Sequence, residues 1–375
     1  MQEIGIGVVG WGFMGRTHTH VLRELGLFYE KAPFRPVLKC VCTRREEAAR
    51  QAMRDGGFER CTTNYSELLA MEDIQVVSIC TPNGLHRDMA VQALQAGKHV
   101  YVDKPLAMDE AEALEIRQAV HDSGLSLQVV HNNRFLPSTM RARELIQAGR
   151  IGQILSFRFD YLHSGSIDPA KTLGWKMSRE GGVLLDLMSH AADLALWLCG
   201  PADRVLCDTR LLYDERPLKD GTLSDDVGED QVVALMRLKC GALGTLEASK
   251  IATGTDDELL FSIYGAKGAL RWNLMEADYL HFYDNTLPEE PLGGEKGFRK
   301  ISCGARFEKP GGIFLPVKNT IGWDRSHMHC YYSFLNAVAC GGPVSPDIEE
   351  ALALQRLMDA MRRSRAEGRW ISLPD

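Results

Sequence analysis

The most unusual group of ionisable residues in the sequence lies in an otherwise apolar segment, residues 182–199. Asp186, His190 and Asp193 are spaced so that their side chains share one stripe of a helix. Ionisable groups on a mostly apolar helix are costly unless they face a cleft or pair with one another. An aspartate beside a histidine orients the imidazole ring and raises its pKa. The pattern therefore predicts either an acid–base pair in a cleft or a buried structural pair.

A metal site is the less favoured interpretation of the same residues. Aspartate and histidine are both metal ligands, but no third and fourth ligand stands at a recognisable spacing. The ten cysteines contain no CxxC pair, which argues against a cysteine zinc site. Several of them, including Cys40, Cys42 and Cys199, lie within apolar runs. We expect no metal, and we expect buried thiols in a reducing compartment.

A glycine-rich turn joins the first β-rich run, residues 4–9, to a helical pattern. Residues 10–15 read GWGFMG, which is the spacing GxGxxG. Between a strand and a helix, the first glycine permits the tight turn, the second admits a pyrophosphate, and the third allows close packing. The free N–H groups at the start of the helix then bind phosphate. This motif predicts dinucleotide binding by Gly10, Gly12, Phe13, Met14 and Gly15.

The end of the second strand, residues 37–42, predicts which nucleotide binds. An acidic residue there would bind the ribose hydroxyl of NAD, whereas arginine accommodates the additional phosphate of NADP. The strand is followed by Thr43, Arg44 and Arg45, and the first acid is Glu46. Arginine offers a planar fork of donors to a phosphate. We therefore expect NADP in preference to NAD, with a solvated basic turn as the alternative.

Polar residues also follow the later strands of this region. Ligands of doubly wound sheets bind at the carboxyl ends of the strands. Lys104 stands at such an end, and Pro105 keeps its backbone extended. A lysine beside a cationic nicotinamide would have a lowered pKa suited to proton transfer, although a surface lysine fits its position equally well. The other residues at these ends are Thr81, Pro82, Asn83, Asp103, Asn132, Asn133 and Arg134.

The elements that position these residues fall into two regions of the 375-residue chain, a length typical of about two domains. Strand and helix patterns alternate up to about residue 134, which predicts a Rossmann-type, doubly wound parallel sheet. Later β-rich runs, separated by glycine turns, predict an α+β domain with an open, mainly antiparallel sheet. We expect domains at 1–133 and 134–375, with the C-terminal helices free to pack back on the first. Residues 288–316 are expected to form a long loop.

Composition excludes other classes of protein. Hydrophobic residues make up 45% and charged residues 25%, as in ordinary globular proteins. The net charge of −7 argues against a nucleic-acid partner, since such proteins neutralise phosphates. No apolar stretch approaches the roughly 18 residues of a membrane span, and no basic leader precedes the first strand. We expect a cytoplasmic protein without a membrane or nucleic-acid partner.

Four segments together resemble the glucose–fructose oxidoreductase / inositol 2-dehydrogenase family (Gfo/Idh/MocA type). They are residues 10–15, CTPNGLH at 80–86, AGKHVYVDKP at 96–105 and GGVLLDLMSHAAD at 181–193. Residues 241–249 and 264–272 resemble the second domain of the family. The similarity thus spans nearly the whole chain. It implies an enzyme that uses NAD(P) to oxidise or reduce a hydroxyl-bearing carbon of a sugar, polyol or related compound.

The resemblance also implies roles for individual residues. Lys104 matches the lysine of the Glu-Lys-Pro motif of the family, and Asp186 with His190 matches an Asp-x-x-x-His pair that meets the substrate. We expect His190 to be the general base, Lys104 to bind the same oxygen, and Asp186 to orient His190; Lys104 as the proton-transfer group is the alternative. The chain departs from the family in having Asp103 for glutamate and Met188 for glycine. The motif at 80–86 adds His86 to the cofactor contacts.

The remaining expectations concern substrate, partners and competing functions. Expected substrate contacts are Lys104, Arg134, His163, Asp186 and His190, and further candidates for the pocket are His131, Trp175, Lys250 and His327. We expect a homodimer or homotetramer formed through the second-domain sheet, with Val233, Leu235, Leu243 and Leu246 among the residues that can supply an apolar patch. A non-catalytic NAD(P)-binding sensor is the competing interpretation, and a metal-dependent lyase or hydrolase is a distant third.

Overall fold

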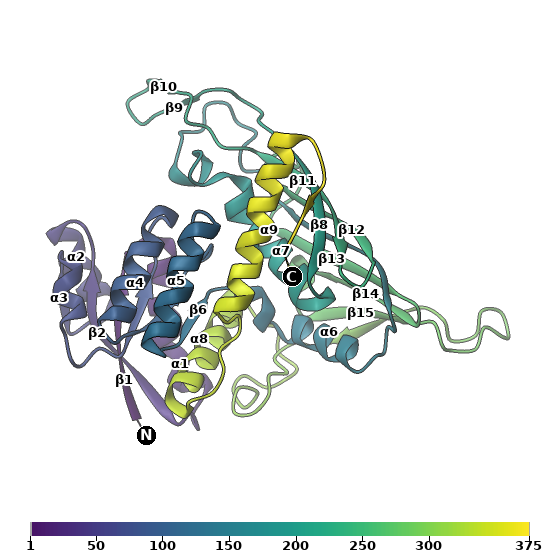
Figure 1. Ribbon diagram of the computed structural model, residues 1–375. Helices are drawn as coiled ribbons and strands as arrows, with labels where there is room; N and C mark the ends of the chain where they lie inside the picture. Colours follow the sequence, from purple (N-terminus) through teal and green to yellow (C-terminus); the bar gives the residue numbers. More distant parts are fainter. Residues whose placement is uncertain (1, 375) are drawn as a thin grey trace. The chain divides into compact units, whose positions relative to one another are not determined.

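The computed structural model describes residues 2–374 (Figure 1). The chain forms two compact units. The first contains the chain up to Phe135 together with Ala305–Gln355. The second contains Leu136–Gly304 and the chain from Arg356 onward. The segment 305–355, which the sequence-based division assigned to the second domain, is therefore grouped with the first unit.

The first unit is built on a six-stranded parallel sheet with the order β3-β2-β1-β4-β5-β6, as predicted for a Rossmann-type domain. Its strands are β1 (Gln2–Val9), β2 (Phe34–Cys42), β3 (Arg60–Thr62), β4 (Val76–Ile79), β5 (His99–Val102) and β6 (Leu127–Val129). Its helices are α1 (Phe13–Phe28), α2 (Glu46–Gly56), α3 (Tyr65–Leu69), α4 (His86–Gln95), α5 (Glu110–Ser123), α8 (Trp323–Cys340) and the first part of α9 (Ile348–Glu367).

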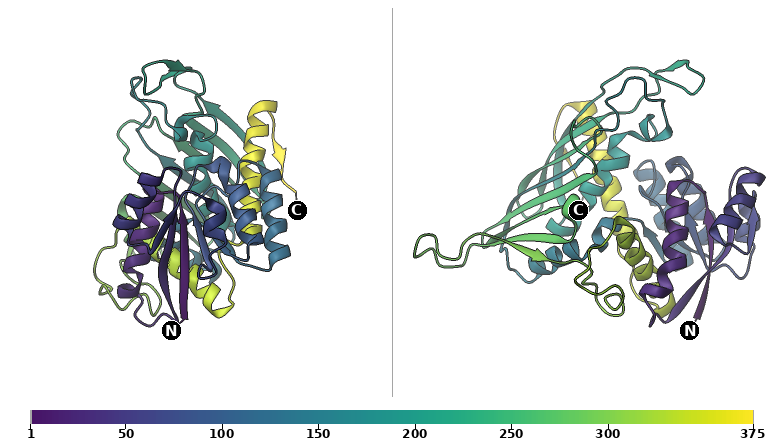
Figure 2. Two further views of the ribbon diagram at one scale, coloured as in Figure 1. Left: turned by 90° about the vertical axis from the view of Figure 1, so that its left-hand side faces the viewer. Right: turned by 180° about the vertical axis from the view of Figure 1, so that it is seen from behind.

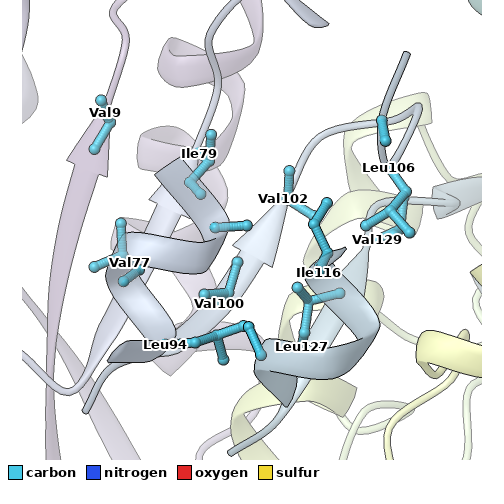
Figure 3. Close-up of a cluster of buried hydrophobic side chains, with 14 of the residues drawn as sticks. Val9, Val77, Ile79, Leu94, Val100, Val102, Leu106, Ile116, Leu127 and Val129 are labelled. Carbon is cyan, nitrogen blue, oxygen red and sulfur yellow. The ribbon is translucent and has the colours of Figure 1, made fainter. Parts of the chain in front are cut away.

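Helices cover both faces of this sheet. Successive side chains of a strand point to opposite faces, so both sets are buried. Val100 and Val102 pack against α4, α5 and the start of α9, in the cluster of Figure 3. Tyr101, between them, packs on the other face against α1 and α8. Its ring lies 3.9 Å from that of Tyr331, and its hydroxyl donates to the Cys330 sulfur at 3.0 Å. Helix α8 thus completes the core of the first unit.

The second unit is built on a nine-stranded sheet with the order β16-β15-β14-β13-β7-β12-β11-β8-β17. All its neighbouring strands are antiparallel except β7 and β12. Its strands are β7 (Ile154–Leu162), β8 (Ala202–Arg210), β11 (Gln231–Leu238), β12 (Leu243–Ser249), β13 (Glu258–Gly265), β14 (Gly268–Asn273), β15 (Tyr279–Asp284), β16 (Phe298–Ser302) and β17 (Ile371–Ser372). A separate hairpin consists of β9 (Arg216–Pro217) and β10 (Leu223–Ser224).

One face of the nine-stranded sheet packs on helices α6 (Pro137–Gln147) and α7 (Ser189–Cys199), as Figure 2 shows. Leu246 is fully buried on this side. On the opposite face, Val233 is 44% exposed, and Leu235 and Leu243 are each 39% exposed. The open sheet therefore presents aliphatic side chains on the face that the helices leave uncovered.

Several local details differ from the sequence-based predictions. The segment 182–199 is not one α-helix, because it begins with the π-helical turn η4 (Leu184–Met188) before α7. The predicted loop at 288–316 contains strand β16, whose mostly exposed residues carry no alternating apolar signal. All ten cysteines are free thiols, but Cys240 and Cys340 are exposed, and Cys61 and Cys80 are only partly buried. Within residues 2–374, no helix is both long and apolar enough to cross a membrane.

Candidate active site

The glycine turn of the first unit has a different constraint at each glycine. Gly10 has a φ of +95°, and a Cβ there would lie 2.5 Å from the Cys80 carbonyl oxygen. A Cβ on Gly15 would lie 2.2 Å from the Gly10 carbonyl oxygen, so this glycine permits α1 to approach β1. A Cβ on Gly12 would meet no atom within 4 Å. The second glycine therefore leaves open space beside the turn, where a pyrophosphate can approach the protein backbone.

The start of α1 fits an anionic group. Gly12 is the N-cap residue, and no side chain among residues 2–374 accepts a hydrogen bond from the first turn of the helix. No acidic residue occupies that turn, and the Phe13 side chain is 70% exposed. Uncapped N–H groups and the positive end of the helix dipole favour phosphate. The residues present thus suit the pyrophosphate of a dinucleotide.

The turn after β2 presents exposed basic side chains. Arg44 is exposed and forms no ion pair or hydrogen bond with any residue in the described range 2–374. Glu46, the first acid after the strand, accepts hydrogen bonds from Arg50 at 2.6 and 3.1 Å. Thr43 donates to the Arg45 carbonyl oxygen at 3.0 Å. The carboxylate is therefore engaged within its own helix, while a guanidinium remains available.

His86 joins the turns that follow β4 and β5. It is fully buried, with Nδ1 2.8 Å from the Pro105 carbonyl oxygen and Nε2 3.0 Å from the Thr81 carbonyl oxygen. Both partners are acceptors, so a neutral ring donates to one at a time. Burial lowers the pKa of His86, although the two carbonyl groups oppose that shift. This histidine holds the Thr81–Asn83 turn against the turn that carries Lys104.

The turn after β5 is fixed by Asp103, which stands where the family that the sequence resembles usually has glutamate. Its Oδ1 accepts a hydrogen bond from the backbone N–H of Lys104 at 2.9 Å. The Lys104–Pro105 peptide bond is cis. Asn83, on the neighbouring turn, is only 3% exposed. The short aspartate side chain therefore bonds to its own turn and shapes the backbone beside Lys104.

Arg134 follows β6 in the short turn η2 (Asn132–Phe135) and binds to other residues of the first unit. It is 3% exposed, and its guanidinium lies 2.8 Å from a carboxylate oxygen of Glu350 and 3.3 Å from the Ser345 hydroxyl. Asn132 donates to the Ser326 hydroxyl at 2.9 Å. These side chains tie the end of the sheet to α8 and α9. The expected contact between Arg134 and a substrate stays a prediction.

In the second unit, the Asp186 carboxylate lies between two lysines. Asp186 belongs to the π-helical turn η4, and its side chain is 8% exposed. Its Oδ2 lies 3.0 Å from Lys250 Nζ, and its Oδ1 lies 3.5 Å from Lys176 Nζ. No local sequence pattern pairs these residues, since 64 positions separate Asp186 from Lys250. The structure therefore adds two cations to the environment of this carboxylate.

His190 lies beside an aromatic and ionic group that the sequence did not indicate. Its ring centroid is 5.6 Å from that of Tyr161. Asp257 accepts hydrogen bonds from the Tyr161 hydroxyl at 2.7 Å and from His163 Nε2 at 2.8 Å. Burial opposes ionisation of Asp257, but the bonds from His163 and Tyr161 outweigh it and lower the pKa of the carboxyl. Tyr161 and Asp257 come from different strand ends, so only the folded sheet brings them together.

The expected site residues thus form two sets, one in each unit. The first unit gathers the glycine turn, the β4 and β5 turns and His86. The second gathers Asp186, His190, His163 and the pocket candidate Lys250, to which the structure adds Tyr161, Asp257 and Lys176. No group of three or more His, Cys, Asp and Glu residues suited to a metal ion occurs between residues 2 and 374.

Known proteins share this organisation. A levoglucosan dehydrogenase from Pseudarthrobacter phenanthrenivorans is 31% identical over 391 aligned residues, covering 100% of this chain and 99% of its own. A myo-inositol 2-dehydrogenase from Thermotoga maritima is 26% identical over 266 residues, covering 71% of this chain and 74% of its own. A solved structure of levoglucosan dehydrogenase in complex with NADH and L-sorbose has a TM-score of 0.95, with 32% identity and complete coverage of both chains.

Family models match both regions of the chain. The model described as an oxidoreductase family, NAD-binding Rossmann fold, matches residues 4–131. The model described as the C-terminal alpha/beta domain of the oxidoreductase family matches residues 143–373. With the glycine turn, the Lys104 turn and the Asp186–His190 segment in place, the chain belongs to the Gfo/Idh/MocA family of NAD-binding oxidoreductases.

Proposed function

We propose that this oxidoreductase transfers a hydride between NAD(P) and a hydroxyl-bearing carbon of a sugar, polyol or inositol-like substrate. The polar group around Asp186 carries the proposal. Its carboxylate, ammonium and imidazole groups offer the mixed donors and acceptors that a polyhydroxylated molecule requires. The named activities of the relatives, on levoglucosan and inositol, support this class of substrate.

The chemistry divides between residues of the two units. The bound nicotinamide supplies the hydride acceptor, or the donor in the reverse direction. His190 takes the hydroxyl proton during oxidation and returns it during reduction. Lys104 donates a hydrogen bond to the same oxygen and stabilises its developing negative charge. Asp186 orients His190 and accepts a hydrogen bond from a neighbouring hydroxyl.

Lys104 as the principal proton-transfer group is the second version of this mechanism. The hydrogen bond from the Lys104 backbone to Asp103 supports it, because it fixes the turn from which the lysine extends. The first experiment is a panel of levoglucosan, inositols, 1,5-anhydro-D-fructose and simple hexoses, each assayed with both nucleotides at the NAD(P)H absorbance band. No change of absorbance with any hydroxyl or carbonyl substrate would refute the proposed function.

The chain prefers NADP to NAD in this proposal. The unengaged Arg44 guanidinium and the Glu46–Arg50 pair support it, because the first acid after the strand is already hydrogen-bonded. A 2′-phosphate would gain charge-assisted hydrogen bonds from Arg44, and from Thr43 once its hydroxyl turns away from the Arg45 carbonyl oxygen. Solved relatives are described as complexes with NADH, so this preference would set the chain apart from them. Dissociation constants for NADH and NADPH test it directly.

The open face of the nine-stranded sheet supports a homodimer or homotetramer. Its exposed aliphatic side chains, including Val233, Leu235 and Leu243, would be covered by a second copy of the same face. Replacing Val233 and Leu235 by glutamate should give monomers in light scattering at micromolar concentration. A monomeric wild-type protein would refute this part of the proposal. The free thiols fit the reducing cytoplasm as the site of action.

A further inference from the structure

Lys250 is a buried lysine whose position is set by the fold of the second unit. It follows β12 directly and is 9% exposed. Its backbone N–H donates to the Asp230 carbonyl oxygen at 2.8 Å, and its own carbonyl oxygen accepts from the Ser166 N–H at 2.8 Å. Because the main chain is held on both sides, the side chain extends from a fixed base toward η4.

The Lys250 ammonium group is held between two oxygens. Its Nζ lies 3.0 Å from Asp186 Oδ2 and donates to the Lys176 carbonyl oxygen at 2.8 Å. Lysine is rarely buried without a partner, because removing an ammonium from water is costly. The same holds for the Asp186 carboxylate, so each ion makes burial of the other tolerable. The pair is a built-in part of the interior around η4.

The second lysine on this carboxylate has a different environment. Lys176 Nζ lies 3.5 Å from Asp186 Oδ1, and its side chain is 52% exposed, against 11% for Lys250. Exposed ion pairs contribute little, because water and salt screen them. Loss of one partner from a buried pair leaves an uncompensated buried charge, which strongly destabilises the protein. Lys250 therefore has the larger effect on the state of the carboxylate.

We infer that Lys250 is a positioning residue that keeps Asp186 ionised and directed as an acceptor for a substrate hydroxyl. This role rests on the proposed function, in which Asp186 contacts the hydroxyl next to the reacting carbon. Without the ammonium, desolvation favours the neutral carboxyl, which loses acceptor strength and is free to rotate. Lys250 thus acts on the substrate through Asp186.

The test compares Lys250→Met, Lys250→Arg and, as a control, Lys219→Met. Lys219 is an exposed lysine of the same unit. For Lys250→Met, kcat/KM should fall at least about 30-fold, the low end for truncating one partner of a buried charge pair. The loss should grow as the pH is lowered, because the carboxyl then keeps only the exposed Lys176 as a cation, with Asp257 as a neighbouring anion, and protonates more readily. Lys250→Arg should recover most of the activity, and the Kd for NADH should stay within about twofold in every variant.

A double variant separates positioning from simple structural support. If Lys250→Met does not fold, Asp186→Asn/Lys250→Met removes both buried charges and should be more stable. Its kcat/KM should equal that of Asp186→Asn alone, since Lys250 acts through Asp186. A further drop in the double variant, or wild-type activity of Lys250→Met across the pH range, would overturn the inference. Absence of any turnover by the wild-type protein would instead refute the proposed function.

Discussion

The glycine turn yields the sharpest prediction, because two of its glycines have opposite surroundings. Gly12→Ala adds a methyl group where, among residues 2–374, no atom beyond the adjoining backbone lies within 4 Å, and the Gly12 φ of −77° is accessible to alanine. Gly15→Ala places its methyl carbon 2.2 Å from the Gly10 carbonyl oxygen unless the backbone moves. The first substitution should therefore disturb only a bound pyrophosphate, whereas the second should disturb the fold itself.

The expected magnitudes follow from these contacts. Alanine is a poorer N-cap than glycine, so Gly12→Ala should cost about 1 kcal/mol or less of stability. Loss of a single charge-assisted hydrogen bond to the pyrophosphate costs about 1.5–3 kcal/mol, which raises the Kd at least about tenfold. Forcing a methyl group into a packed backbone contact at Gly15 should lower the free energy of unfolding by about 1–3 kcal/mol.

Thermal unfolding without nucleotide and titrations with NADH and NADPH check both variants. Gly12→Ala should melt within about 3 °C of the wild-type protein and bind both nucleotides at least tenfold more weakly. Gly15→Ala should melt at a clearly lower temperature. Unchanged binding of both nucleotides by Gly12→Ala would show that the pyrophosphate does not lie over this glycine. A Gly15→Ala protein with wild-type stability would refute the close-packing argument.

Three further predictions concern single side chains. Arg44→Ala should raise the Kd for NADPH about tenfold or more and leave that for NADH nearly unchanged; a wild-type preference for NADH would contradict it. Lys104→Ala and His190→Ala should each lower turnover about 100-fold or more, with a double variant little worse than either. Full turnover in His190→Ala would leave Lys104 as the proton-transfer group. Burial lowers the pKa of His18 from 6.5 to about 4. The unfolded chain therefore takes up a proton below pH 6.5, so this histidine should cost about 2 kcal/mol of stability at pH 5. In His18→Gln, Tm should fall less steeply than in the wild-type protein as the pH is lowered from 6.5 to 4. If Tm depended on pH equally in both proteins, His18 would not be the cause of the fall.

Local patterns identified most of the first unit because its chemistry is carried by short segments. The glycine turn and Lys104 each lie at the end of a strand, and one parallel sheet brings such ends to one edge. The strand patterns at 4–9 and 37–42 correspond to β1 and β2. In this unit the local sequence patterns agree with the topology of the sheet, so the glycine turn and Lys104 are recognisable from the sequence alone.

The second unit was less predictable because its site depends on contacts between distant strands. Asp257 accepts from Tyr161 across 96 positions of sequence, and Lys250 meets Asp186 across 64. A single sequence holds no signal for such pairs. The predicted stripe through Asp186 and His190 assumes regular α-helical spacing. The structure has a π-helical turn at this point, which changes the spacing between side chains. Strand β16 was missed because its mostly exposed residues give no alternation of apolar and polar side chains.

The return of α8 to the first unit has a consequence for biosynthesis. The hydroxyl of Tyr101 bonds to Cys330, which the ribosome adds 229 residues later. Until then, the face of the sheet that α8 covers exposes Tyr101 and its aliphatic neighbours to water. The dinucleotide-binding sheet therefore matures only after the intervening second unit has been synthesised.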